Sequence, residues 1–215
     1  CRALVGALVW CTGQTRPDIA FDVANAASHN QKATYEQLRK LNAIVDKAKR
    51  TDVSMAYTTI PDEEIVLLGY ADAAWANLPN GGTGGGYIVG LSDLHTFGFL
   101  SWRCRRLKRI VKSTLAGETL ALTDLVDELV VMRDTVRRMT GTAPRTIART
   151  DCMNLHDHII KGKQVSEKRL HVELSMLKEV VENKECEIEW VDTAEQLSDC
   201  LTKHMVAHRL LAVMR

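Results

Sequence analysis

The sequence predicts an α/β layer fold with a mixed sheet. Three observations support this: a nearly continuous apolar run from Ile65 to Ala71, a long amphipathic stretch from Thr114 to Met139, and short alternating segments on either side of it. A continuous apolar run is typical of a strand buried on both faces. Apolar residues at steps of three and four are typical of a helix with one buried face. Strands and helices that alternate along a chain form a sheet covered by helices.

The first part of the chain, to about residue 50, is predicted to be helical. Pro17 suits a first helical position, and Asp18 favours the positive end of a helix. A second helix is expected to begin at Thr34, because Gln37 completes a capping-box pattern. Its apolar stripe consists of Leu38, Leu41, Val45 and Ala48. A linker is expected to follow.

The middle of the chain is predicted to form an antiparallel meander. The apolar run ends at Asp72, and we interpret the glycine-rich stretch from Gly81 to Gly86 as a hairpin turn. A phosphate-binding loop is disfavoured, because no Lys-Ser or Lys-Thr pair follows and no helix opens there. Strands are expected over Tyr87 to Leu91 and over Thr96 to Trp102.

The second half is expected to alternate helices and strands. The long helix should end before Gly141. Four elements follow: a strand over Thr146 to Thr150, a helix to about Ile160, a helix over Lys168 to Asn183, and a strand over Cys186 to Val191. Asp192 and Glu195 form a capping pattern for a last helix through Lys203.

Composition limits the classes of function. Hydrophobic residues make up 46% and charged residues 26%, which is ordinary for a globular protein. No apolar stretch reaches the roughly 18 residues of a membrane span, and the signal-peptide pattern is missing. The net charge of +1 means that any nucleic-acid contact must come from local patches. The six cysteines are scattered, which favours a reduced, intracellular protein without a zinc site. Because the chain begins at Cys1 inside an apolar run, we expect it to be part of a longer protein.

Four carboxylates are candidates for a site. Asp72 and Asp151 each follow an apolar strand, where open α/β sheets bind ligands, although an ordinary turn is the simpler alternative. Glu118 lies on the apolar stripe of the long helix, where a carboxylate is costly unless it is paired or binds a metal. The alternative is an acid at the edge of the stripe, favoured by the helix dipole. Asp199, in the predicted last helix, would alone be a solvated acid.

These acids indicate metal-ion chemistry. Carboxylates without a Cys or His ligand set favour Mg²⁺ or Mn²⁺. Two such ions about 4 Å apart can support hydrolysis of a phosphodiester. His156 and His158 are expected to be solvated. The remaining acids of the long helix are expected to be surface charge: Asp124, Asp127, Glu128 and Asp134.

One dense basic patch lies between Trp102 and the long helix. It consists of Arg103, Arg105, Arg106, Lys108, Arg109 and Lys112. A basic run is usually a solvated loop, but its position beside Glu118 favours binding of nucleic-acid phosphates.

Six segments of the sequence carry a resemblance to a known family. They are Thr15-Arg16-Pro17-Asp18-Ile19, Tyr70 to Ala76, Ser101-Trp102-Arg103, Ser113 to Leu122, Thr150-Asp151 and Gln196 to Lys203. In this order they resemble the end of the reverse transcriptase and the ribonuclease H region of copia-type LTR retrotransposon Pol polyproteins. The resemblance covers nearly the whole chain, and it is the ordered set of motifs that is specific.

The resemblance implies a ribonuclease H-like fold, with a mixed five-stranded sheet flanked by helices and preceded by a small helical segment. Residues 1–55 would be the tail of the reverse transcriptase or connection region, 63–204 the ribonuclease H-like domain and 205–215 a C-terminal tail. Two Mg²⁺ or Mn²⁺ ions would be held by Asp72, Glu118 and Asp151, with Asp199 completing the second site. The implied partners are an RNA–DNA hybrid and the upstream reverse transcriptase, without a membrane. The implied location is intracellular, in cytoplasmic virus-like particles or the nucleus.

The sequence also departs from the family. Ala74 stands where a second acid is often found, and Gly81 to Gly86 replaces basic and hydroxyl residues. The loop from Asp192 to Glu195 holds no histidine that could act as a mobile general acid. Two alternatives therefore remain beside the hybrid-specific ribonuclease. One is an inactive structural module or genomic relic, and the other is an integrase-like or resolvase-like DNA nuclease, which the polymerase-like front segment disfavours.

Overall fold

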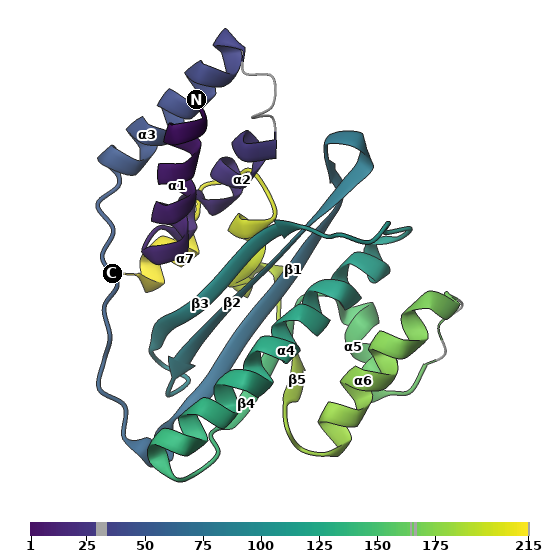
Figure 1. The fold of residues 1–215 in the computed structure, drawn as a ribbon. Coiled ribbons are helices and arrows are strands. Elements are labelled where there is room, and N and C mark those ends of the chain that lie inside the picture. Colours follow the sequence, from purple (N-terminus) through teal and green to yellow (C-terminus); the bar gives the residue numbers. More distant parts are fainter. Residues whose placement is uncertain (29–33, 164, 166, 215) are drawn as a thin grey trace.

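The central feature of the protein is a five-stranded mixed sheet (Figure 1). The computed structural model describes residues 1–28, 34–163, 165 and 167–214. The strands are β1 (Val66–Leu78), β2 (Gly82–Ser92), β3 (Phe97–Arg106), β4 (Arg145–Thr150) and β5 (Glu187–Trp190), in the spatial order β3-β2-β1-β4-β5. The first three pair antiparallel, whereas β4 runs parallel to β1 and β5 parallel to β4. The predicted mixed sheet is confirmed.

One face of the sheet carries the larger core. It is covered by α4 (Thr114–Thr140), α5 (Met153–Ile160) and α6 (His171–Glu182) (Figure 1). Helix α4 begins where the Ser113 hydroxyl accepts a hydrogen bond from the amide of Ala116, and it ends at Gly141, whose φ is positive. Of its predicted apolar stripe, Leu122, Leu125 and Leu129 are fully buried, Leu115, Met132 and Val136 are partly buried, and Met139 in the last turn is exposed.

The opposite face carries a second core. Successive residues of β1 alternate between the two faces, so Leu67 joins the first core and Leu68 the second. The second core is covered by η7 (Leu197–Leu201), α7 (His208–Val213) and the first turn of α2 (Ala20–Ser28). Helix α7 lies in the predicted C-terminal tail, and its Leu210 is buried.

The N-terminal segment packs on this second face. It consists of α1 (Arg2–Gln14), η1 (Pro17–Ile19), α2 and α3 (Tyr35–Arg50). The predicted capping box of α3 is present at Thr34 and Gln37. The indole of Trp102 in β3 donates to the carbonyl of Thr12 at 2.7 Å, which ties this segment to the sheet. No helix of the described ranges is both long enough and apolar enough to cross a membrane.

The sequence predictions for the glycine-rich stretch and for the last helix are wrong. The glycines from Gly82 to Gly86 lie in β2, and the turn is the short η4 (Pro79–Gly81). Their lack of side chains serves packing: a Cβ on Gly86 would lie 2.7 Å from the Cβ of Leu201. The predicted last helix is instead two 3₁₀ segments, η6 (Thr193–Glu195) and η7. It breaks at Gln196, which is extended because its side chain bonds to β1.

Candidate functional site

Three of the four predicted acids come together at one end of the sheet. Each of Asp72, Glu118 and Asp151 offers a carboxylate oxygen, and these oxygens lie within 4.8 Å of one another. We call these three residues the acidic centre. Asp72 lies inside β1, just beyond its last pair with β4 at Tyr70, whereas Asp151 directly follows β4. The prediction that β1 ends at Asp72 is therefore wrong, but pairing with β4 does end there.

The acidic centre depends on a close approach of α4 to β1. A Cβ on Gly117 would lie 3.3 Å from the Cβ of Ala73, so the helix can bring Glu118 beside Asp72. Both acids are buried, with 1% of Asp72 and 6% of Glu118 exposed. One carboxylate oxygen of Glu118, Oε2, is buried without a hydrogen-bond partner. Such an oxygen is costly unless something further binds it.

Burial and mutual repulsion change the acidity of these groups. The pKa of Glu118 lies well above its ordinary value of 4.5, because of burial first and the charges of Asp72 and Asp151 second. The pKa of Asp72 is also raised, chiefly by burial. Lys203 and Thr202 oppose that shift, because a nearby positive charge and a donated hydrogen bond favour the carboxylate.

Hydrogen bonds hold two of the carboxylates in place. The buried hydroxyl of Thr202 donates to Oδ2 of Asp72. The hydroxyl of Thr193 donates to Oδ2 of Asp151 at 2.9 Å. Gln196 is buried and donates from Nε2 to the carbonyl of Ala71 at 2.8 Å, directly beside Asp72. Sequence reasoning assigned these residues no role, although Thr202 and Gln196 both lie in the segment Gln196 to Lys203.

Asp199 lies at the same end of the sheet but outside the acidic centre. It is on η7, and its Oδ1 pairs with Nζ of Lys203 at 2.5 Å. The same ammonium lies 3.5 Å from Oδ1 of Asp72. The structure therefore brings three predicted acids together and links the fourth to them through a lysine.

The predicted basic patch spans a strand and a loop. Arg103, Arg105 and Arg106 belong to β3, and Lys108, Arg109 and Lys112 belong to the loop before α4. Arg105 pairs with Asp124 of α4 at 2.5 Å, and Arg109 pairs with Glu173 of α6. The other four are exposed. The indole of Trp75, in β1, donates to the carbonyl of Val111 at 3.1 Å, which holds this loop at the acidic end of the sheet.

The two histidines of α5 are less exposed than predicted. His158 is buried, and its Nδ1 shares a hydrogen bond with the carbonyl of Lys163 at 3.0 Å, so the prediction of a solvated side chain is wrong. His156 is partly buried. Neither belongs to the acidic centre, which is the group of potential metal ligands found among the described residues.

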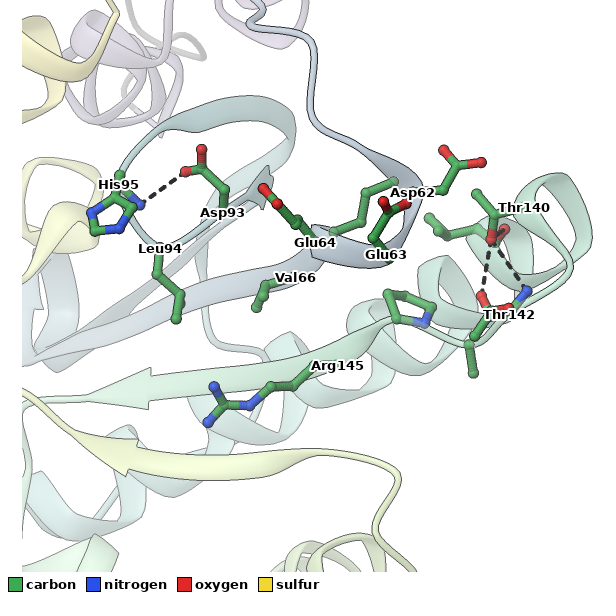
Figure 2. Close-up of a pocket in the computed structure, with 14 residues that line it drawn as sticks. Asp62, Glu63, Glu64, Val66, Asp93, Leu94, His95, Thr140, Thr142 and Arg145 are labelled. Carbon is green, nitrogen blue, oxygen red and sulfur yellow. Dashed lines mark hydrogen bonds between the residues drawn. The ribbon is translucent and has the colours of Figure 1, made fainter.

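A cavity of about 440 Å³ lies at the other end of the sheet (Figure 2). Asp62, Glu63, Glu64 and Asp93 line it together with Arg145, at the start of β4. Its acidic side chains point in different directions around the opening (Figure 2). This cavity therefore lies away from the acidic centre.

The residues of the acidic centre fit a hard divalent cation. The donor atoms are carboxylate oxygens, which Mg²⁺ and Mn²⁺ prefer. The unpartnered Oε2 of Glu118 is available as a ligand. Asp72, Glu118 and Asp151 could hold such an ion together, and Asp199 could contribute if its pair with Lys203 opened.

Among known sequences, the chain is distantly similar to a curated protein. No family model matches the chain. A curated relative, the secreted RxLR effector protein 161 of Plasmopara viticola, is 25% identical over 139 residues, which cover 64% of this chain and 94% of the relative.

Solved structures with a similar fold include ribonucleases H. LC11-RNase H1, determined in complex with an RNA/DNA hybrid, has a TM-score of 0.51 at 14% identity, covering 67% of this chain and 99% of that one. RNase H1 of Halobacterium salinarum has a TM-score of 0.44 at 15% identity, covering 60% and 87%. The five-stranded mixed sheet and the first of these likenesses establish that the chain has the ribonuclease H fold.

Proposed function

We propose that this chain is a metal-dependent endoribonuclease that cleaves the RNA strand of RNA–DNA hybrids during reverse transcription of a retrotransposon. The observation that carries this proposal is the acidic centre, three converging carboxylates at one end of a ribonuclease H fold. The structure of LC11-RNase H1 in complex with an RNA/DNA hybrid supports the substrate class. The ordered motifs of the copia-type family support the retrotransposon setting.

The residues divide into ligands and residues that position them. Asp72, Glu118 and Asp151 would hold two Mg²⁺ or Mn²⁺ ions, with Asp199 completing the second site. Bound there, these ions would activate a water molecule and stabilise the leaving oxygen of the phosphodiester. Thr202 fixes the carboxylate of Asp72 by its hydrogen bond. A fixed ligand geometry lowers the cost of orienting the reacting groups.

The basic patch is proposed to hold the phosphates of the hybrid. The proposed contacts are Arg103, Arg105, Arg106, Lys108, Arg109 and Lys112, of which Arg105 and Arg109 are paired with acids in the free chain. Lys108 and Lys112 are exposed on the loop that Trp75 holds near the acidic centre. Because such contacts release counterions, affinity for the hybrid should fall as salt rises.

The N-terminal helices are proposed to belong to the preceding polymerase. We assign residues 1–55 to the tail of the reverse transcriptase and 63–204 to the nuclease domain. The hydrogen bond from Trp102 to Thr12 and the hydrogen bond between His204 Nδ1 and Asp22 Oδ1 at 2.7 Å support a fixed junction between them. The upstream polymerase would then deliver the hybrid to the acidic centre.

Cleavage of a labelled RNA–DNA hybrid by the purified chain, with Mg²⁺ or Mn²⁺, tests the proposal. We expect metal-dependent cutting of the RNA strand alone. Asp72→Asn should lower the rate by more than roughly 100-fold, since changes outside the ligand shell already cost about 10–100-fold. Asp93→Asn, at the other end of the sheet, is the matched control and should cut normally. A folded protein that leaves the hybrid intact with both metals would contradict the proposal and favour an inactive structural module.

A further inference from the structure

Lys203 brings a positive charge to the edge of the acidic centre. Its Nζ lies 2.5 Å from Oδ1 of Asp199 and 3.5 Å from Oδ1 of Asp72. The lysine side chain is 43% exposed, whereas that of Asp72 is 2% exposed. The ammonium therefore approaches Asp72 from the solvent side and lies between it and Asp199.

The backbone beneath Lys203 is held firmly. The amides of Thr202 and Lys203 both donate to the carbonyl of Asp199, at 3.1 and 3.0 Å. The side-chain amide of Asn77, in β1, donates to the carbonyl of Thr202 at 2.7 Å. Because Gly86 has no side chain, the turn that contains Leu201 and Thr202 can pack against β2, and Thr202 is fully buried. The lysine is thus anchored at its backbone, while its long side chain can still swing into solvent.

Under the proposed function, Asp72 and Asp199 would both help to hold a second cation, next to the position that the ammonium of Lys203 occupies. A cation shared by these two carboxylates would occupy the space of the ammonium and repel its charge. The pairs that Lys203 makes with both acids would be lost on binding. A cation held by Asp72, Glu118 and Asp151 needs no such exchange with Asp199, because its ligand oxygens already converge.

We propose that Lys203 is a built-in competitor of the second divalent cation, which binds only when the ammonium leaves Asp72 and Asp199. In the metal-free chain the lysine neutralises these acids and holds Asp199 near the acidic centre. The two cation positions therefore differ in affinity, the one beside Asp199 being weaker. This inference rests on the proposed function, because it concerns the same site.

Calorimetric titration of Mn²⁺ into the metal-free chain, without nucleic acid, tests this inference. Lys203→Gln should bind the second ion roughly tenfold tighter, because one positive charge within a few ångströms has been removed. Lys203→Arg keeps the charge and should bind like the unchanged chain. The matched control is Lys161→Gln, which removes a lysine paired with Asp157 at 2.7 Å with the same four-residue spacing.

Thermal unfolding gives a second readout that is independent of cleavage. Without metal, Lys203→Gln should unfold at a lower temperature, since it leaves acids unpaired, and Mn²⁺ should raise its Tm more than that of the unchanged chain. Equal Mn²⁺ affinity in the unchanged chain and in Lys203→Gln would overturn the inference while leaving the proposed function intact. Absence of Mn²⁺ binding in both would overturn both.

Discussion

Acidic side chains gather at both ends of the central sheet, and the two groups differ in burial and in partners. Around the cavity of Figure 2, Asp62, Glu63 and Glu64 are exposed to solvent. Asp93 there accepts hydrogen bonds from the amides of Thr96 and His95, which lower its pKa to about 2. At the other end, Asp72 and Glu118 are buried, and their pKa values are raised.

The difference in burial and partners distinguishes solvated surface acids from acids that could form a metal-binding site. Exposed carboxylates are solvated individually, and they gain little from a bound ion. Buried carboxylates that face one another lose hydration and repel, so a cation that enters between them relieves both costs. The cavity of Figure 2 thus lies at the end whose acids are exposed to solvent or already hydrogen-bonded. Convergence and burial, rather than the number of acids or the size of a cavity, identify the acidic centre.

The sharpest test of this comparison is Glu118→Gln beside Glu63→Gln. The first change should abolish cleavage and yet stabilise the metal-free chain by about 1–3 kcal/mol, since an unpartnered buried charge is removed. The second change should alter neither property measurably. Urea denaturation in the presence of a chelator, with the cleavage assay in parallel, measures both. If Glu118→Gln instead weakened the metal-free fold, the carboxylate would be a structural partner rather than a strained ligand.

The acids at the two ends of the sheet should contribute to the pH dependence of stability with opposite signs. Because the pKa values of Glu118 and Asp72 are raised on folding, the folded chain binds more protons than the unfolded one between the ordinary and the raised values. The metal-free chain should therefore gain stability as pH falls from neutral through the raised values toward about 4.5. Asp93 acts oppositely, since its contribution is lost as pH falls from 3.8 toward about 2.

Denaturation at a series of pH values, with chelator present, checks this sign. Glu118→Gln should flatten the gain between neutral pH and about 4.5, and Asp93→Asn should reduce the loss below it. A stability that falls steadily from neutral pH in the metal-free chain would contradict the burial argument for the acidic centre.

The order of strands and helices and the three acids of the acidic centre were predictable from sequence, because both depend on local patterns. Apolar runs and stripes define which faces are buried, and Glu118 was conspicuous as a carboxylate on such a stripe. Other features depend on contacts between distant segments. Gly86 pairs with Asp72 in β1 and with Cys104 in β3, and it lacks a side chain because Leu201 packs against it; no local pattern reveals either contact.

The final turn was mispredicted for a related reason. Asp192 and Glu195 form a local pattern that favours a helix, but the bond of Gln196 to Ala71 joins residues 125 positions apart and breaks the helix. The contacts that Thr202 and Lys203 make with Asp72 depend on this broken helix. A sequence pattern can identify Asp199 as an acid four residues before Lys203, but it does not reveal that this lysine also lies 3.5 Å from Asp72, which is distant in the sequence.

The smallest predicted effect concerns Thr202, which links the mispredicted turn to the acidic centre. Thr202→Val keeps the shape of the side chain but removes the hydrogen bond to Asp72, so the pKa of Asp72 should rise further. Unfolding of the metal-free chain should become easier by about 1 kcal/mol, the net value of a typical hydrogen bond. Thr135→Val, at an exposed position of α4, is the control. Titration of Asp72 by NMR tests whether the hydroxyl of Thr202 lowers the pKa of this carboxyl group. An unchanged pKa in Thr202→Val would mean that the hydroxyl only fills space and leaves the carboxylate unaffected.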